Sequence, residues 1–523
     1  MAVGPDRLSP TSAPGAAKPG EVSPASAHPP GRSIGRTHLG FAFKRIEHVL
    51  GGPARSRVIA LFAATLALSS ADSSTVGASA RELRAALGIS NGDIGLLVSV
   101  SQGVGALAGI PFGMLVDRVN RTRLLAVMIG LWGLIMLASA SVTSFASLLL
   151  VRIGLGFVTG AASPSVASLV GDYFASDERG RIYSYVLTGE LLGAGVGFFI
   201  TGDVAAISWR AAFVILAVPA FLLAWQVHRL PEPARGGVTQ IESGAESLDH
   251  LEEARPDPGA TSSTDQARLT ETQRRALDTG VAPDPAMILS SDPQQLGLLA
   301  AARYILGIRT NVVLIVSGAA AYFFMTGIQT FGLEFVNRQY GVSTVLANLL
   351  MLVIGAGAVL GVIVGGNAGD ALTRRGRING RMLVAGVAAT ATVGLFVPAA
   401  FTHDPMTALP YITAAAFCLA AQNPTLDAAR LDIMPPTLWG RAEGVRTLLR
   451  AGAQSIAPLT FGGLSDLLSG THQGLRYTFI IMLVPLAASG LILLRGLRYY
   501  PTDVATAAAS NAAHRRAGQP GQP

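Results

Sequence analysis

The chain has 523 residues, of which half are apolar and only 14% are charged, and its mean hydropathy is positive. A soluble chain of this length rarely tolerates that balance, so the composition excludes an ordinary soluble protein and predicts an integral membrane protein. The formal net charge of +7 comes from arginines in predicted loops, where it indicates topology and gives little reason to expect nucleic acid as a partner.

The first 54 residues are predicted to be a disordered cytoplasmic tail. Residues 1–40 are rich in Pro, Ala, Gly and Ser, and they lack the apolar core of a cleavable signal peptide. Residues 41–50 fit a short interfacial amphipathic helix and a solvated lead-in equally well.

Apolar segments of about 20 residues follow, the length a helix needs to cross a hydrocarbon core of roughly 30 Å. We predict an all-α membrane fold with twelve such helices, six in each of two pseudo-symmetric bundles over residues 55–228 and 309–497. The segments lie near 58–76, 93–115, 123–142, 146–170, 183–204, 211–228, 310–333, 343–366, 380–400, 407–428, 441–463 and 476–494. Those near 58–76 and 441–463 are the least apolar.

The loops on one face contain few basic residues, namely Arg81, Arg84, Arg210, Arg338 and Arg476. Because basic loops stay cytoplasmic, we expect both termini inside the cell and the protein in the plasma membrane. Residues 229–308 carry too little apolar surface to fold alone, so they are predicted to be a cytoplasmic linker whose last stretch, from about 294 to 308, follows the membrane surface. Residues 498–523 form a cytoplasmic C-terminal tail.

A charged hairpin between two apolar segments occurs twice, with an offset of 253 residues. The first copy contains Gly113, Asp117, Arg118, Arg121 and Arg123, and the second contains Gly366, Asp370, Arg374 and Arg375. A second pair of loops, one with Asp172 and Arg181 and the other with Asp432 and Arg441, repeats at an offset of 260 residues. Two such repeats predict two related halves around a central site.

The paired Gly-x-x-x-Asp-x-x-x-Arg hairpin resembles the loop 2–3 signature of the major facilitator superfamily. The resemblance implies a transporter with this fold. A carboxylate at a helix end caps the positive N-terminus of a neighbouring helix. Asp117 and Asp370 are therefore expected to cap the helices that begin near Arg181 and Arg441. The resemblance implies that these contacts latch the cytoplasmic face.

Within the superfamily, residues 152–164, 171–181, 209–213, 231–236 and 435–466 resemble the Spinster-like branch in patches. That branch moves lysolipids and sphingoid-type lipids, with proton coupling proposed for several members, so the resemblance implies a lipid-like substrate. Two positions depart from its pattern: Thr159 stands where the branch often has Glu, and Ser73 stands where it tends to have Arg.

Small residues at four-residue spacing predict close helix packing in lipid. The stripes are Gly105, Gly109 and Gly113; Gly156 and Gly160; Gly189, Gly193 and Gly197; and Gly357, Gly361 and Gly365.

Ionisable side chains within spans are costly and usually face a cavity or a partner. They are Asp72, Arg152, Glu190, Glu334, Arg446 and Arg450. We predict Asp72 and Arg152 as a central pair, with the coupling proton on Asp72 or Glu190 and an anionic group on Arg152 and Arg446. The alternative is structural ion pairs or groups that extend toward the membrane surface, with Arg446 and Arg450 near the cytoplasmic face and Glu334 at the outer rim.

The sequence therefore predicts a secondary active transporter of a small amphipathic or anionic solute, coupled to protons and bound to no cofactor or metal. A lysolipid or sphingoid carrier, a multidrug exporter, an importer of an organic anion and a non-transporting receptor remain alternatives. An enzyme is not expected, because the elbow-like Gly88–Gly92 lies in a short loop and neither lysine belongs to a phosphate-binding loop. In the seventh span, Tyr322, Phe323, Phe324 and Phe331 are candidates for a cavity wall.

Overall fold

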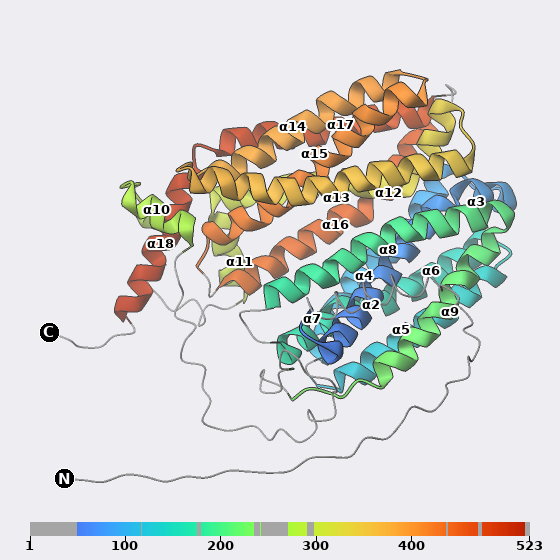
Figure 1. The fold of residues 1–523 in the computed structure, drawn as a ribbon, viewed down its shortest axis with the longest axis horizontal. Coiled ribbons are helices and arrows are strands. Elements are labelled where there is room, and N and C mark those ends of the chain that lie inside the picture. Colours follow the sequence, from blue (N-terminus) through green and yellow to red (C-terminus); the bar gives the residue numbers. More distant parts are fainter. Residues whose placement is uncertain are drawn as a thin grey trace, which may run out of the picture.

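The computed structural model describes residues 50–116, 118–174, 179–234, 241, 270–289, 298–435, 438–468 and 473–517. Each predicted span coincides with a helix, which confirms the all-α membrane fold (Figure 1). The spanning helices are α2 (Pro53–Ala78), α4 (Asn91–Val116), α5 (Arg121–Ser141), α6 (Phe145–Thr159) with α7 (Ala162–Tyr173), α8 (Arg179–Ile207), α9 (Trp209–His228), α12 (Arg309–Tyr340), α13 (Thr344–Arg374), α14 (Gly380–Phe401), α15 (Pro405–Asp432), α16 (Trp439–Leu467) and α17 (Gly474–Gly496). The amphipathic helix considered for residues 41–50 lies outside the described residues, except for Leu50.

The described chain also has shorter or peripheral helices at the two ends of the bundle. They are α3 (Ala80–Leu87), α10 (Glu271–Asp278), α11 (Leu298–Gly307) and α18 (Tyr500–Ala517). Figure 1 places α3 at one end and the other three at the opposite end. We call these the α3 end and the α10 end.

Hydropathy separates two of the spans from the rest. Ten helices of the described chain are long and apolar enough to cross a membrane, and the two that fall short are α15 and α16. The sequence predicts a low hydropathy for the segment that forms α16, but it does not single out the segment that forms α15. Both helices carry charged side chains, which membrane helices keep in the protein interior or in a water-filled cavity.

The fourth span is not continuous, although the sequence predicts one helix over 146–170. It ends as α6 at Thr159 and resumes as α7 at Ala162. Pro164 has no N–H to donate to the Gly160 carbonyl, and at the break the Ala161 N–H bonds the oxygen of Val158, three residues before it, at 3.3 Å. Proline thus breaks the span near its middle.

The glycine stripes are contact surfaces, as predicted. Gly189, Gly193 and Gly197 of α8 lie against backbone and side-chain atoms of Ala63, Ala67 and Ala71 in α2, so closely that an added methyl group would overlap them. Gly357, Gly361 and Gly365 of α13 meet α15 in the same way, and Gly105 of α4 meets Gly156 of α6. Gly113 is the exception, because it faces open space.

The two six-helix halves are joined by polar contacts that gather at the α3 end. The Asp466 carboxylate of α16 accepts hydrogen bonds from the backbone N–H of Asn91 at 3.2 Å and of Gly92 at 2.6 Å, so it caps the N-terminus of α4 in the other half. Asn348 Nδ2 of α13 donates to Asp203 Oδ1 of α8 at 2.7 Å. These contacts hold the halves together at this end.

Glu334 takes part in the same closure. It forms ion pairs with Arg84 from the other half and with Arg338. Its side chain is only 5% exposed, so the prediction of a rim residue is wrong. The reason is that α3 folds over the end of α12 and covers the carboxylate.

Part of the predicted linker is ordered because it docks on the C-terminal half. Gln273 Nε2 of α10 donates to the Asp432 backbone oxygen at 2.9 Å, and the N–H of Asp284 donates to Thr506 Oγ1 of α18 at 2.8 Å. Thus α18, which lies within the predicted tail 498–523, packs against linker residues. Ala301 and Ile305 of α11 are fully buried, so this part of the predicted surface stretch packs on the bundle.

Candidate functional site

Asp72 of α2 and Arg152 of α6 are in contact, as the sequence predicts. Arg152 Nη1 donates to Asp72 Oδ1 at 2.9 Å, and both residues are at most 3% exposed. The Phe213 ring lies 5.1 Å from the guanidinium carbon, and Arg152 Nε and Nη2 have no hydrogen-bond partner in the described part of the chain. The pair is therefore enclosed within the N-terminal half.

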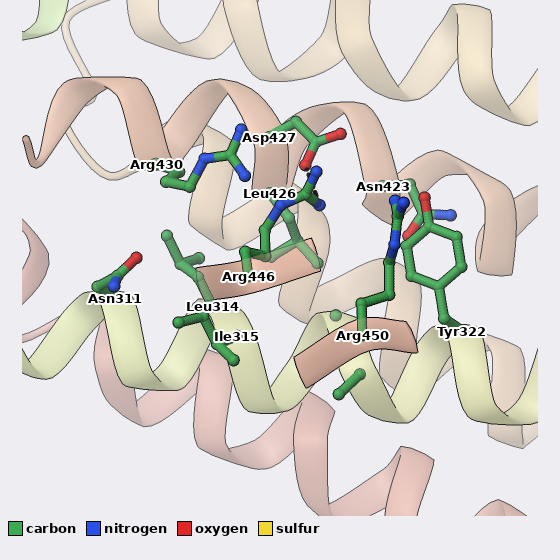
Figure 2. A pocket seen from close by; sticks show the side chains of 12 residues that line it. Asn311, Leu314, Ile315, Tyr322, Asn423, Leu426, Asp427, Arg430, Arg446 and Arg450 are labelled. Carbon is green, nitrogen blue, oxygen red and sulfur yellow. Dashed lines mark ion pairs between the residues drawn. The ribbon is translucent and has the colours of Figure 1, made fainter. Parts of the chain in front are cut away.

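A hollow with about 390 Å³ of empty space lies between α12, α15 and α16 of the C-terminal half. Figure 2 shows its side chains converging from these three helices. We call it the arginine cavity, because Arg430, Arg446 and Arg450 line it. Its other polar lining residues are Asn311, Tyr322, Asn423 and Asp427. Leu314, Ile315 and Leu426 supply apolar wall.

Two of the three arginines are neutralised by carboxylates of the same half. Arg446 Nη1 lies 2.8 Å from Asp427 Oδ1, and Arg446 Nη2 lies 2.6 Å from Glu443 Oε1. Arg430 forms an ion pair with Glu443 as well. Forked contacts of this kind hold a guanidinium in one orientation, so Arg446 and Arg430 form a fixed wall.

Arg450 differs, because in the described part of the chain it makes no hydrogen bond or ion pair. Its guanidinium carbon lies 4.7 Å from the centre of the Tyr322 ring, and its buried Nε has no partner. A carboxylate of the other half, Glu190 of α8, interacts electrostatically with Arg450. Glu190 itself is exposed. The positive charge of Arg450 is thus available to an anion that enters between the halves.

Glu190 and Arg450 are separated by 260 residues, the offset that also relates the repeated loops. Each is the twelfth residue of its helix, since α8 begins at Arg179 and α16 begins at Trp439. Equivalent positions in the two halves therefore hold opposite charges at the same depth. This pair spans the interface between the halves.

The structure thus separates the predicted site residues into two groups. Arg446 and Arg450 share the arginine cavity with Glu190 opposite, whereas Asp72 and Arg152 lie apart in the N-terminal half. Sequence reasoning overlooked Asn311, Asn423, Asp427, Arg430 and Glu443. A signal was available for some of them: Asp427 with Arg430 and Glu443 with Arg446 are opposite charges three residues apart, which places each pair on one helix face.

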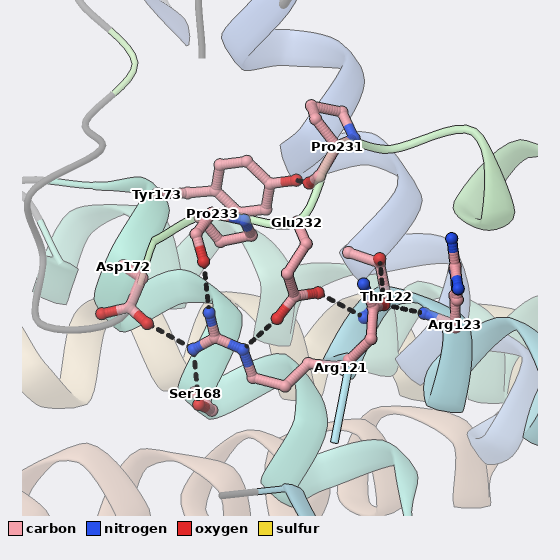
Figure 3. Close-up of polar contacts among 10 residues, drawn as sticks. Arg121, Thr122, Arg123, Ser168, Asp172, Tyr173, Pro231, Glu232 and Pro233 are labelled. Carbon is pink, nitrogen blue, oxygen red and sulfur yellow. Dashed lines mark hydrogen bonds and ion pairs between the residues drawn. The ribbon is translucent and has the colours of Figure 1, made fainter. Parts of the chain in front are cut away.

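Arg121 of the first hairpin is the centre of a polar network at the α10 end (Figure 3). It is 1% exposed, pairs with Asp172 of α7, and lies 2.7 Å from Glu232 Oε1, while its Nη2 donates to the Pro233 oxygen at 2.7 Å. The network ties the hairpin to the chain that leaves α9. Arg118 and Arg123 are exposed.

In the second half the equivalent network is built on Arg381, which the sequence analysis did not select. Arg381 Nη1 lies 2.6 Å from Asp432 Oδ2, and its Nη2 lies 2.8 Å from Asp370 Oδ1. Arg374 and Arg375 are exposed instead, because they follow the end of α13. Arg381 stands 260 residues after Arg121, and this spacing was the signal that would have identified it.

Tyr500 of α18 completes this second network. Its hydroxyl donates to Asp432 Oδ2 at 2.8 Å. Burial, together with the neighbouring Asp432 carboxylate, raises the pKa of the Tyr500 hydroxyl well above its usual range, so it remains a hydrogen-bond donor at neutral pH.

Among the described residues, Asp370 bonds Arg381 of its own half and not the expected helix N-termini near Arg181 and Arg441. The carboxylate reaches this arginine because both residues flank one short hairpin. Asp117 lies outside the described residues, as does the side chain of Arg181, and Arg441 lies in the first turn of α16.

The aromatic residues of the seventh span have different environments. Tyr322 lines the arginine cavity, but Phe324 and Phe331 are buried in the core. Phe324 and Phe479 line a second, apolar hollow with about 490 Å³ of empty space inside the C-terminal half. No group of three or more His, Cys, Asp or Glu side chains in the described part of the chain could hold a metal ion.

Comparison with known families gives a match to the Major Facilitator Superfamily over residues 61–458 and, in a second match, over residues 314–519. The probable L-galactonate transporter of Escherichia coli K12 is 29% identical over 154 residues, which are 29% of this chain and 34% of that protein. The 4-hydroxybenzoate transporter of Pseudomonas aeruginosa is 28% identical over 190 residues, 35% of this chain and 41% of that protein. Protein spinster homolog 1 of Xenopus laevis is 30% identical over 211 residues, 39% of this chain and 38% of that protein. The matched regions therefore span about a third to two fifths of these relatives.

Solved structures share the fold over almost the whole chain. A bacterial homologue of the human lysosomal transporter Spinster, in an inward-facing and unoccupied conformation, has a TM-score of 0.62 at 19% identity and covers 87% of this chain and 98% of its own. A D-xylose–proton symporter has a TM-score of 0.58 at 14% identity and covers 84% of this chain and 97% of its own.

Proposed function

Since this chain belongs to the major facilitator superfamily of membrane transporters, we propose that it carries a small organic anion held at Arg450, with protons as the coupling ion. The single observation behind this proposal is that Arg450 has no anionic partner of its own half, although it lines a cavity whose other arginines are paired. A guanidinium in such a place favours a carboxylate, which accepts two parallel hydrogen bonds from it.

The names of the relatives are in keeping with an anionic substrate. L-Galactonate and 4-hydroxybenzoate are both carboxylates, and those two proteins are named as their transporters. The lysolipid or sphingoid carrier is the second candidate, supported by the likeness to Spinster proteins. A cavity lined by three arginines favours a small acid over a long acyl chain.

Glu190 is our candidate for the coupling proton. In the unprotonated state its carboxylate competes with a substrate for Arg450, and protonation removes that competition. Asp72 is the weaker candidate, because it is enclosed with Arg152, whereas Glu190 is exposed. We place both termini on the cytoplasmic side, because the basic loops lie at the α10 end. The contacts at the α3 end then correspond to a carrier closed to the outside.

The test is uptake by proteoliposomes that contain the full chain and an internal pH indicator. Labelled 4-hydroxybenzoate and L-galactonate are supplied in turn. We expect proton entry that depends on an acid in the wild-type protein. Uptake should fall at least about 10-fold in Arg450→Gln, because the charge-assisted hydrogen bonds are lost. The matched control is Arg498→Gln, which removes an exposed arginine outside the cavity.

Glu190→Gln separates coupling from binding. This variant should still exchange labelled acid across the membrane while its proton entry disappears. Wild-type uptake by Arg450→Gln would contradict the anion site. Folded wild-type protein that moves neither acid would favour a substrate of another class or a receptor.

A further inference from the structure

Two asparagine side chains of the arginine cavity have a buried oxygen without a hydrogen-bond donor. They are Asn311 Oδ1 and Asn423 Oδ1, within the part of the chain that the structure describes. Asn311 is 1% exposed, and its Nδ2 donates to the Ile305 backbone oxygen at 2.8 Å, which fixes the orientation of the amide. Buried polar groups almost always have partners, so an acceptor that lacks one on a cavity wall points to a missing donor.

Of the two asparagines, only Asn423 lies close to Arg450. Figure 2 shows Arg450, Tyr322 and Asn423 together at one end of the cavity, with Asn311 at the other end beyond Arg430. Asn311 and Tyr322 stand eleven residues apart on α12, which corresponds to roughly 16 Å along a helix. A small acid bound at Arg450 does not reach that far. Asn423 is therefore the acceptor beside the anion site.

Within the part of the chain that the structure describes, no side chain of this cavity donates a hydrogen bond to Asn423 Oδ1. The guanidinium groups of Arg430 and Arg446 are held by Glu443 and Asp427. Arg450 is the remaining lining arginine, and its charge is needed for the carboxylate. The Tyr322 hydroxyl lies at the same end of the cavity (Figure 2) but makes no hydrogen bond to Asn423 Oδ1. A bound substrate is therefore left as the donor for this oxygen.

We propose that the substrate is a hydroxylated carboxylate, with its carboxylate on Arg450 and a hydroxyl group that donates to Asn423 Oδ1. This inference rests on the proposed function and makes it narrower. Aromatic hydroxy acids and open-chain sugar acids share this chemistry. The wall of Leu314, Ile315 and Leu426 suits a ring, whereas Asp427 suits further hydroxyl groups.

The test compares acids with and without hydroxyl groups. Dissociation constants are measured by titration calorimetry on the full chain in lipid nanodiscs. One pair is 4-hydroxybenzoate and benzoate, and the other is L-galactonate and hexanoate, which have equal numbers of carbon atoms. In one pair we expect the wild-type protein to bind the hydroxylated acid at least about 10-fold more tightly. An acid without the hydroxyl group leaves a buried acceptor unpaired. The pair that shows the preference tells whether the substrate is an aromatic hydroxy acid or a sugar acid.

Two substitutions at one position make the test specific. Asn423→Leu keeps a similar size but removes the acceptor, so the preference for the hydroxylated acid should fall to within about 2-fold. Asn423→Asp keeps an acceptor but adds a negative charge, so it should weaken both acids and retain the preference.

The outcomes distinguish the two proposals. Equal binding of both members in each pair, with Arg450→Gln still abolishing binding, would overturn the hydroxyl inference and leave the anion site in place. An unchanged preference in Asn423→Leu would also overturn it, since water would then satisfy the amide. Binding of none of the four acids by the folded protein would overturn both proposals.

Discussion

The two six-helix halves repeat one structural network and differ in the chemistry placed on it. Arg121 pairs with Asp172 in the N-terminal half, and Arg381 pairs with Asp432 in the C-terminal half, 260 residues later in each case. The chain that follows the last helix of each half closes both networks, through Glu232 in the first and Tyr500 in the second. Both networks join the same elements at the α10 end.

The interiors of the halves differ at equivalent positions. Arg152 of α6 corresponds to Ile412 of α15 at the same offset, and Phe213 of α9 corresponds to Phe479 of α17 at a slightly larger offset of 266 residues. In the N-terminal half Arg152 is buried with Asp72 under Phe213, whereas Ile412 and Phe479 line an apolar hollow in the C-terminal half. One half thus holds a buried ion pair where the other holds empty apolar space.

The reverse difference occurs nearer the α10 end. The arginine cavity of the C-terminal half has Asp427, Arg430 and Arg446, while the equivalent positions of the N-terminal half are Ala167, Val170 and Val186. The two halves share the contacts that hold helices in place, because both halves need them. They do not share the polar groups of the interior, because a substrate without two-fold symmetry needs each group only once.

The largest expected effect comes from exchanging the charges at the equivalent positions 190 and 450. Arg450→Glu should lower uptake about 100-fold or more, because the substrate carboxylate loses its guanidinium partner. Loss of one charge of a desolvated pair costs about 2–5 kcal/mol. The double variant Glu190→Arg with Arg450→Glu restores opposite charges but moves the arginine away from Tyr322 and Asn423. Its uptake should therefore stay near that of the single variant, and recovery to the wild-type rate would mean that the halves are interchangeable.

The next effect concerns the buried pair of the N-terminal half. Asp72→Asn leaves Arg152 buried without a carboxylate, so the free energy of unfolding, from titration with detergent, should fall by about 3 kcal/mol. The double variant Asp72→Leu with Arg152→Leu imitates the apolar interior of the other half and should unfold within about 1 kcal/mol of the wild type. We expect it to lose transport. Wild-type transport by the double variant would show that the pair has no role in the cycle.

The smallest effect is a difference between the two repeated networks. Arg381→Met leaves the fully buried Asp432 carboxylate with Tyr500 as its remaining donor, whereas Arg121→Met leaves Asp172 and Glu232, which are 14% and 24% exposed and can be hydrated. The first variant should lose about 1–2 kcal/mol more unfolding free energy than the second, because an unpaired charge costs most where water does not reach it. The same titration measures both. Equal losses would mean that the networks have the same environment.

Much of the fold could be predicted, and less of the site. Hydropathy located every span, although it did not predict the break at Gly160 and Ala161 or the packed helix α18. The repeated spacing selected Asp172 and Asp432, and each of them pairs with an arginine of its own half. The same spacing also selected Arg374 and Arg375, but the arginine that pairs with Asp432 is Arg381. Asn423 was overlooked, because the prediction selected ionisable side chains within the spans and an amide carries no charge.

The sequence by itself determined the membrane class, the number of spans and the division into two halves, because each depends on the length and repetition of local segments. Only the tertiary structure decided that Arg446 is paired, that Arg450 has no anionic partner of its own half and that Asp72 is enclosed with Arg152. Those outcomes depend on the rotation and depth of helices that are as many as 260 residues apart in the chain. The energy of an ion pair changes over a few ångströms, a scale that residue order does not specify.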